Sequence, residues 1–358
     1  MRTKLETALC RLLQIRYPIV LAGMAGGPTT AELVAAVSNA GGLGTLGGAY
    51  LDADALRDAI RNIRGKTDKP FAVNLFAAVM RDDNKRTPRM QKILNGFRRE
   101  LGIAAADGAP LRSADRLAAQ LEVLLTENVP VISTAFGVLP DAAMREAKAR
   151  GMRVIAMVTT VQEACEAEKK GVDIVVAQGS EAGGHRGTFD VARHPMGANI
   201  GTMALVPQVV DRVRIPVVAA GGIMDGRGLA ASLALGAQGV QMGTRFLTAL
   251  ESGAHPAYQE ALLKSTEESS RITKVFSGRP ARALANSFMD RLEANGEEPL
   301  PFPTQNTATR DIRNAAARQN NPAYMSLWAG QGVRMLTADK GAAEIIRDIV
   351  DQATEILG

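Results

Sequence analysis

The sequence has few cysteines, and it lacks an apolar run long enough to span a membrane. Among its 358 residues only Cys10 and Cys165 are cysteines. Two are too few for a disulfide framework or a cysteine-rich metal site, so a reducing compartment, the cytoplasm, is expected. A membrane-spanning helix needs about 18 consecutive apolar residues, and no such run is present. Charged residues, Glu6, Arg11 and Arg16, interrupt the N-terminal region, which therefore does not resemble a signal peptide.

Aromatic residues and candidate metal ligands are also scarce. Aromatics make up 4% of the chain and three residues are histidines. The net charge of +5 comes mostly from residues 81–116, where nine lysines and arginines stand against five acidic residues. Phe97 is the one aromatic residue in that segment, so it lacks the stacking platforms of nucleic-acid-binding proteins. Neither nucleic-acid binding nor a metal is expected, and the segment is interpreted as a solvated surface or an anion-steering lid.

Short β-branched apolar runs alternate with amphipathic helical stretches along most of the chain. This alternation predicts parallel βαβ units, and the unbroken apolar character of the strands indicates burial on both faces. We count eight strands, which predicts a (β/α)8 TIM barrel forming a single domain over 1–358. A basic helical insertion, a lid after the third strand, is expected at 79–126, and an extended return loop at 289–328. The expected strands are residues 17–24, 42–47, 71–75, 129–137, 154–158, 173–178, 215–222 and 237–246.

Gly42, Gly44 and Gly47 spell the G-x-G-x-x-G pattern of dinucleotide-binding proteins. That pattern binds a pyrophosphate only when it follows a strand and opens a helix. Here a helix is expected before the glycines and a strand among them. The glycines are therefore interpreted as tight helix-to-strand packing.

Candidate ligand-binding residues follow the first and third strands, at the C-terminal ends where TIM-barrel active sites lie. Met24, Ala25 and Gly26 would let a planar ligand lie against the backbone, although a plain glycine turn explains them equally well. Asn74, in an otherwise apolar strand, would either cap the next segment or contact the ligand.

The segment after the sixth strand gives the sharpest indication of a functional site. Gln178 ends a buried strand, Gly183 makes room for a ligand, and His185 stands on the glycine-rich loop. With an imidazole pKa near 6.5, this histidine could act as a base at neutral pH. His194 and His255 lie in proline-flanked loops and are expected at the surface.

Two further glycine loops follow the seventh and eighth strands, where TIM barrels frequently bind phosphate. Their backbone N–H groups and one threonine hydroxyl could converge on a single phosphate group. The residues concerned are Gly221, Gly222, Gln241, Met242, Gly243 and Thr244.

These loops carry a family resemblance. LAGMAGG at 21–27, QGSEAGGHRG at 178–187, VVAAGGI at 217–223 and VQMGTRF at 240–246, followed by FSGRPAR and WAGQG, resemble nitronate monooxygenases. The resemblance implies FMN at the barrel mouth, without reduction by NAD(P)H, and oxidation of a nitronate or nitroalkane by O2 to a carbonyl compound and nitrite. His185 becomes the base or the nitronate-orienting residue. The implied FMN contacts are Met24, Ala25, Gly26, Asn74, Gln178, Gly183, Gly221, Gly222, Gln241, Met242, Gly243 and Thr244.

Other activities are compatible with the same loops. Barrel-type enoyl-acyl-carrier-protein reductases and some NADH:quinone reductases are similar there, so an NAD(P)H-dependent FMN reductase is one alternative and a non-catalytic flavin-binding protein is another. The basic insertion could attract a carboxylated nitronate, an acidic carrier protein or nicotinamide phosphates. Trp328 is either packing beneath a lid or a ligand contact. The expected partners are a small-molecule substrate and O2, and a homodimer is left open.

Overall fold

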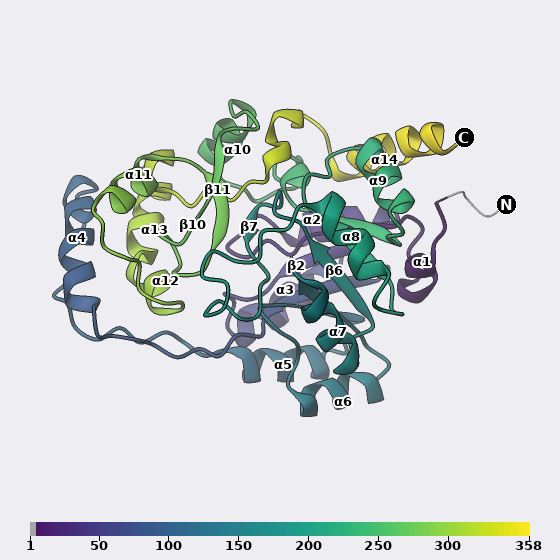
Figure 1. The fold of residues 1–358 in the computed structure, drawn as a ribbon, viewed down its shortest axis with the longest axis horizontal. Helices are drawn as coiled ribbons and strands as arrows, with labels where there is room; N and C mark the ends of the chain where they lie inside the picture. Colours follow the sequence, from purple (N-terminus) through teal and green to yellow (C-terminus); the bar gives the residue numbers. More distant parts are fainter. Residues whose placement is uncertain (1–4) are drawn as a thin grey trace.

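Eight parallel strands form a barrel in the computed structural model, which describes residues 5–358 (Figure 1). Their order is β1-β9-β8-β6-β5-β4-β3-β2. The main-chain N–H of Leu21 donates to Leu43 O, and that of Leu43 to Ile19 O, both at 2.9 Å, which joins β1 to the chain entering β2. The TIM-barrel prediction is therefore confirmed. The barrel strands are β1 (Ile19–Leu21), β2 (Gly44–Gly47), β3 (Phe71–Phe76), β4 (Val131–Ala135), β5 (Arg153–Val158), β6 (Ile174–Gln178), β8 (Val217–Ala220) and β9 (Gly239–Met242).

Helices cover the outside of the barrel, and several begin at the capping residues that the sequence supplies. Thr30 accepts a hydrogen bond from Leu33 N, and Asp52 accepts one from Ala55 N, so both satisfy exposed N–H groups of a first helical turn. A Cβ atom at Gly44 would lie 2.0 Å from Val34 O, which shows that this glycine permits close helix-to-strand packing. The outer helices are α2 (Ala31–Asn39), α3 (Ala53–Arg64), α5 (Leu117–Thr126), α6 (Asp141–Ala149), α7 (Val161–Lys169), α8 (Thr202–Val210), α9 (Gly226–Ala234) and α14 (Ala342–Leu357).

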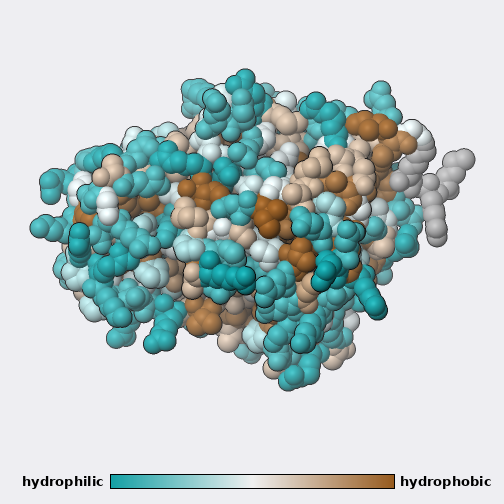
Figure 2. All heavy atoms as spheres, in the orientation of Figure 1, coloured by the Kyte–Doolittle hydropathy of each residue, from teal (hydrophilic) through white to brown (hydrophobic). Residues whose placement is uncertain are grey.

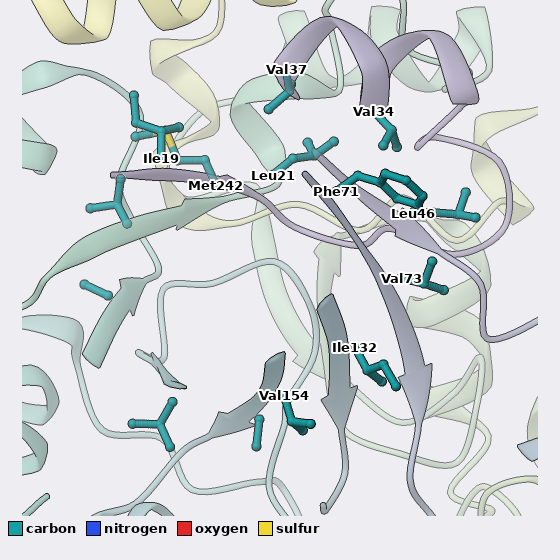
Figure 3. Packing of buried hydrophobic residues seen from close by; sticks show 14 of the residues in the cluster. Ile19, Leu21, Val34, Val37, Leu46, Phe71, Val73, Ile132, Val154 and Met242 are labelled. Atoms are coloured by element: carbon teal, nitrogen blue, oxygen red, sulfur yellow. The ribbon is translucent and has the colours of Figure 1, made fainter. Parts of the chain in front are cut away.

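The strand residues alternate between two apolar layers, because successive side chains of a strand point to opposite faces. Figure 3 shows Ile19 and Leu21 of β1 in the outer layer, together with Val34 and Val37 of α2. Val20, between them in sequence, belongs to the separate cluster inside the barrel. The strands are thus buried on both faces, as their unbroken apolar sequences predicted.

A short helix, α1 (Ala8–Leu13), closes the N-terminal end of the barrel. Leu9, Cys10 and Leu13 are buried in the cluster that fills the barrel interior. The Thr7 hydroxyl donates to Gln238 O at 2.6 Å and ties this helix to the segment before β9. Because the N-terminal end is filled, the C-terminal end is the side open to a ligand.

A second group of elements has its own apolar core and covers the C-terminal end of the barrel; we call it the mouth lobe. Four of its helices, α4, α11, α12 and α13, lie together at the left of Figure 1. A three-stranded sheet, ordered β10-β11-β7, links the lobe to the loop after β6. The lobe consists of α4 (Thr87–Glu100), α10 (Pro256–Leu263), β10 (Ser270–Thr273), β11 (Ala281–Leu284), α11 (Ser287–Ala294), α12 (Thr304–Ala308), α13 (Arg310–Arg318), η2 (Pro322–Tyr324) and η3 (Gln331–Met335); β7 is Gly184–His185.

The sequence predicted an extended return loop over 289–328, but helices α11, α12 and α13 occupy much of this segment. Asn286 caps α11 by accepting a hydrogen bond from Met289 N. Ile312, Ala315 and Ala316 give α13 a buried face against the lobe core. The polar composition concealed this narrow apolar face, which is why a loop was expected.

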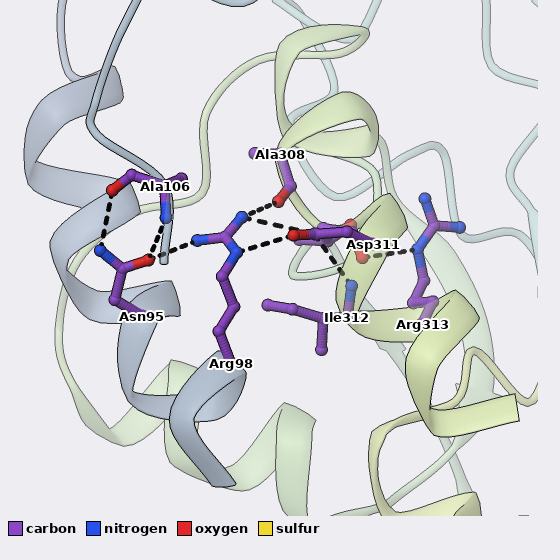
Figure 4. Close-up of polar contacts among 8 residues, drawn as sticks. Asn95, Arg98, Ala106, Ala308, Asp311, Ile312 and Arg313 are labelled. Atoms are coloured by element: carbon purple, nitrogen blue, oxygen red, sulfur yellow. Dashed lines mark hydrogen bonds and ion pairs between the residues drawn. The ribbon is translucent and has the colours of Figure 1, made fainter. Parts of the chain in front are cut away.

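The two helices of the predicted 79–126 insertion have different surroundings. Helix α5 packs against α3 and β3 as a helix of the barrel wall, whereas α4 belongs to the mouth lobe. Figure 4 shows Arg98 of α4 joined to α13. Its guanidinium donates to Asp311 at 2.8 Å, to Ala308 O at 2.9 Å and to Asn95 at 2.9 Å. This basic residue therefore holds the lobe together and does not face solvent.

The face of the molecule in Figure 2 is largely hydrophilic, with hydrophobic residues in small separate groups. Among the large apolar side chains, Val79 is 86% exposed and Met203 is 67% exposed. No helix within residues 5–358 has the length and apolar character needed to cross a membrane.

Candidate active site

A cavity of about 870 Å³ lies where the C-terminal ends of the barrel strands meet the mouth lobe. The structure brings all thirteen residues of the predicted site to the lining of this cavity. They are Met24, Ala25, Gly26, Asn74, Gln178, Gly183, His185, Gly221, Gly222, Gln241, Met242, Gly243 and Thr244.

Polar side chains form the floor of the cavity, above the apolar barrel interior. Asn74 of β3 lies in register with Ser133 of β4 and donates a 3.1 Å hydrogen bond to its hydroxyl. Gln178 donates to His185 O at 3.0 Å and accepts from Gly187 N at 2.8 Å. Gln178 therefore fixes the backbone of the loop that carries His185.

His185 is held by the mouth lobe as well as by the barrel. Its strand β7 pairs with β11 through Ala281, and its Nε2 lies 2.8 Å from Ser277 Oγ. The Ser277 hydroxyl donates to Arg279 O at 3.1 Å and accepts from Arg279 N at 3.2 Å. Because its own hydrogen is directed to Arg279 O, the Ser277 hydroxyl accepts a hydrogen bond from His185 Nε2–H. This pattern leaves the free lone pair of the ring on Nδ1.

The His185 imidazole is neutral at ordinary pH. Burial, followed by the positive charges of Arg279 and Arg313, lowers the pKa of His185 from 6.5 to about 3. The sequence had indicated an ordinary imidazole pKa, because neither the burial of His185 nor its proximity to the two arginines can be predicted from the sequence. A weakly basic ring beside two cations favours an anionic ligand over the formation of an imidazolium.

Aromatic rings, although scarce in the chain, gather around His185. The ring centroid of Trp328 lies 5.2 Å from that of His185, with Phe136 at 5.6 Å and Phe76 at 6.0 Å. Tyr50 packs edge-on against Phe76 at 5.6 Å. Apart from Trp328, these residues were not predicted for the site, since each occurs singly in a different segment.

Charged and histidine side chains that the sequence did not assign to the site also line the cavity. Arg116 reaches it from the end of the insertion, and Arg310 and Arg313 reach it from α13. His255 was expected at the surface, but it lines the cavity and its Nδ1 accepts from Ala257 N at 3.1 Å. The proline after His255 was a detectable signal that a helix starts there. The direction of the His255 side chain, however, depended on how α10 packs.

The loops after β8 and β9 fit a phosphate group. Gly221 and Gly222 have φ values of +118° and +71°, which suit residues without a Cβ. A Cβ atom at Gly243 would lie 3.3 Å from the Ala22 Cβ, a tight contact, and 3.5 Å from the Met24 sulfur. Thr244 Oγ1 accepts from Gly330 N at 3.0 Å, which leaves its hydroxyl hydrogen free to donate to a ligand.

The neighbouring N-terminus of α8 is already paired with a carboxylate. Glu181 accepts from Thr202 N at 3.0 Å and from the Thr202 hydroxyl at 2.8 Å. An added anion would be repelled there. The β8 and β9 loops are therefore the better phosphate cradle.

Fold and site together define a TIM-barrel enzyme whose ligand is bound by loops after the strands. The chain belongs to the nitronate monooxygenase family, whose model matches residues 6–352. The resemblance noted from the sequence is thereby confirmed, and the family places the chain among oxidoreductases.

Individual relatives match almost end to end. A probable nitronate monooxygenase of Staphylococcus saprophyticus is 42% identical over 357 residues, covering 99% of each chain. The solved structure of nitroalkane oxidase from Streptomyces ansochromogenes is similar with a TM-score of 0.88 and 37% identity, covering 98% of both chains. FabK from Thermotoga maritima is similar with a TM-score of 0.78 and 33% identity, covering 98% of this chain and 97% of that one.

Proposed function

We propose that this enzyme binds FMN and oxidises nitronates with O2, giving a carbonyl compound and nitrite. The observation that carries the proposal is the neutral His185 ring, held by Ser277 and close enough to Arg279 and Arg313 for their charges to lower its pKa. An anionic, planar nitronate suits a site of this kind. Family membership supports the reaction class.

The residues of the cavity fit FMN. The phosphate would be held by Gly221, Gly222, Gly243 and the Thr244 hydroxyl, since glycine loops present backbone N–H groups to such an anion. The ring system would be contacted by Met24, Ala25, Gly26, Asn74, Gln178, Gly183, Gln241 and Met242. Bound there, FMN would supply the redox chemistry of the reaction.

The protein groups around His185 would select and orient the substrate. Arg313, which lines the cavity, would stabilise its negative charge, and His185, whose Nδ1 lone pair is free, would contact its reacting carbon. The surrounding rings of Phe76, Phe136 and Trp328 would limit access of water. Because a pKa of about 3 makes His185 a weak base, the already ionised nitronate is favoured over the neutral nitroalkane.

Two measurements test the proposal. Mass spectrometry of the chromophore released by heat should identify FMN, and FAD or no flavin would contradict the cofactor assignment. Stopped-flow mixing of the purified protein with a nitronate and O2 should give nitrite, whereas NADH should leave the flavin oxidised. Rapid reduction by NADH without nitrite release would instead show a reductase, and no reaction with either would show a non-catalytic flavin protein.

A further inference from the structure

A second cavity, of about 390 Å³, lies beside the candidate active site. Its lining is apolar apart from Arg279, and it includes Val79, Phe189 and Phe302. Val79 is 86% exposed, so this cavity reaches the surface at the segment after β3. Within the described part of the chain, Phe136 is the one residue that lines both cavities.

Phe136 has an unusual backbone for a large side chain. It follows β4 with φ at +71°, in the left-handed region that bulky residues rarely adopt. The Thr134 hydroxyl donates to Gly137 O at 2.8 Å and holds the turn in this form. Such conformations persist where the surrounding structure enforces them, and they cluster at functional sites.

The Phe136 ring forms a partition between the cavities. On one side it lies 5.6 Å from the His185 ring, and on the other the Arg279 guanidinium carbon lies 3.9 Å from its centroid. Phe136 is the residue common to the two linings. A rotation of one ring would therefore connect the second cavity to the space beside His185.

The two cavities differ in the molecules they favour. The active-site cavity carries Arg116, Arg310 and Arg313, and FMN with an anionic substrate would fill it. The second cavity is open to the surface at Val79, and its lining residues are apolar apart from Arg279; apolar cavities take up apolar guests such as xenon. O2 is small and apolar, and it needs a path that remains open when FMN and the nitronate are bound.

We propose that the second cavity is a binding site and access path for O2, and that Phe136 is its gate to the active site. The inference rests on the proposed function, because O2 is the co-substrate there. It adds a route separate from the one that the nitronate uses.

The first experiment is independent of any activity. Crystals of the enzyme exposed to xenon under pressure should show xenon in the second cavity, against Phe136. An absence of xenon from this cavity would overturn the binding site, whether or not the enzyme oxidises nitronates.

The second experiment measures the reaction of O2 with flavin that has been reduced by dithionite, so no nitronate is required. Val79→Trp should obstruct the outer end of the cavity and slow this reaction several-fold, with the KM for nitronate unchanged. Met203→Trp is the matched control, because Met203 is also exposed, at 67%, and lines neither cavity. Phe136→Leu shortens the gating side chain and should make this reaction faster than in the wild type.

An unchanged O2 rate in Val79→Trp would overturn the access path, even if xenon binds. Equal slowing in Val79→Trp and Met203→Trp would also overturn it. A flavin-binding protein that failed to oxidise nitronates would still yield both measurements, and for a protein without flavin the xenon result decides. Failure of this inference can thus be told apart from failure of the proposed function.

Discussion

The barrel and the mouth lobe are built from different kinds of residue and contribute differently to the site. The barrel core consists mainly of valine, alanine, leucine and isoleucine in layers, and its strand ends offer glycine loops. The lobe core contains Phe97, Phe276, Phe288 and Tyr324. The barrel would provide backbone groups for a cofactor, and it contributes the Phe76 and Phe136 rings beside His185. The lobe contributes Ser277, Arg279, Arg313 and Trp328, which contact His185 or lower its pKa.

His185 stands where these two regions meet. Its loop begins at the end of β6, but β7 pairs with β11 of the lobe, and Ser277 and Trp328 contact its ring. Substitutions in the barrel loops should therefore remove the cofactor. Substitutions in the lobe should change the reactivity of His185 or the stability of the protein while FMN stays bound. Four predictions follow from this division, beginning with the largest expected effect.

Replacing Gly243 by valine should give a folded but colourless protein. The backbone φ of −110° accepts any residue, and the nearest neighbour of a Cβ atom, at 3.3 Å, is the small Ala22 side chain. The added methyl groups would occupy the phosphate cradle instead. Visible absorbance and circular dichroism measure the two properties, with Gly96→Ala in the lobe helix α4 as control, where a Cβ atom meets nothing within 4 Å. Full flavin occupancy in Gly243→Val would show that the cradle is misplaced.

Replacing His185 by asparagine should separate the two substrates. Whatever turnover of a neutral nitroalkane the wild type shows needs a base, so that rate should fall by roughly 10²–10⁴. Oxidation of the nitronate, which has already lost the proton, should largely persist with FMN bound. Initial rates of nitrite release with both substrates provide the measurement. Equal losses on both would indicate that His185 orients the substrate, and unchanged rates would remove it from the mechanism.

Replacing Arg98 by methionine should destabilise the lobe without removing the flavin. The buried guanidinium bonds to Asp311, Ala308 and Asn95, and losing hydrogen bonds to a charged group costs about 2 kcal/mol. The neighbouring Arg99 is exposed, so Arg99→Met should change the free energy of unfolding by less than about 0.5 kcal/mol. Urea denaturation of both variants measures this, and equal stabilities would mean that the Arg98 contacts contribute nothing.

The smallest effect expected is on the pH dependence of stability. The pKa of His185 is about 3 in the folded protein and near 6.5 when unfolded, so between these values the unfolded chain binds the extra proton. The contribution of His185 to the free energy of unfolding is complete above about pH 6.5, and it declines as the pH falls toward about 3. Between about pH 7.5 and about pH 5.5 the wild type should therefore lose roughly 1 kcal/mol more than His185→Asn. Parallel losses in the two proteins would mean that the histidine pKa is not lowered.

Local sequence patterns were sufficient to predict the barrel and its ligand loops. A short apolar run bounded by proline and glycine, such as VVAA at β8, predicts a doubly buried strand, and a glycine pair at the C-terminal end of that strand reaches the barrel mouth by topology. The thirteen predicted site residues gather in one cavity for this reason. Helix α13 was missed because its few apolar positions acquire meaning only against the lobe core.

The sequence by itself determined the fold class, the family, the glycine loops and the presence of His185 at the strand ends. Only the tertiary structure decided the state of that histidine, since Ser277, Arg279, Arg313 and Trp328 come from segments distant from it in the chain. Periodicity and turn signals are local, whereas a pKa depends on burial and on charges that only folding brings near. The gathering of the scarce aromatic rings around His185, and the second cavity behind Phe136, have the same origin in long-range packing.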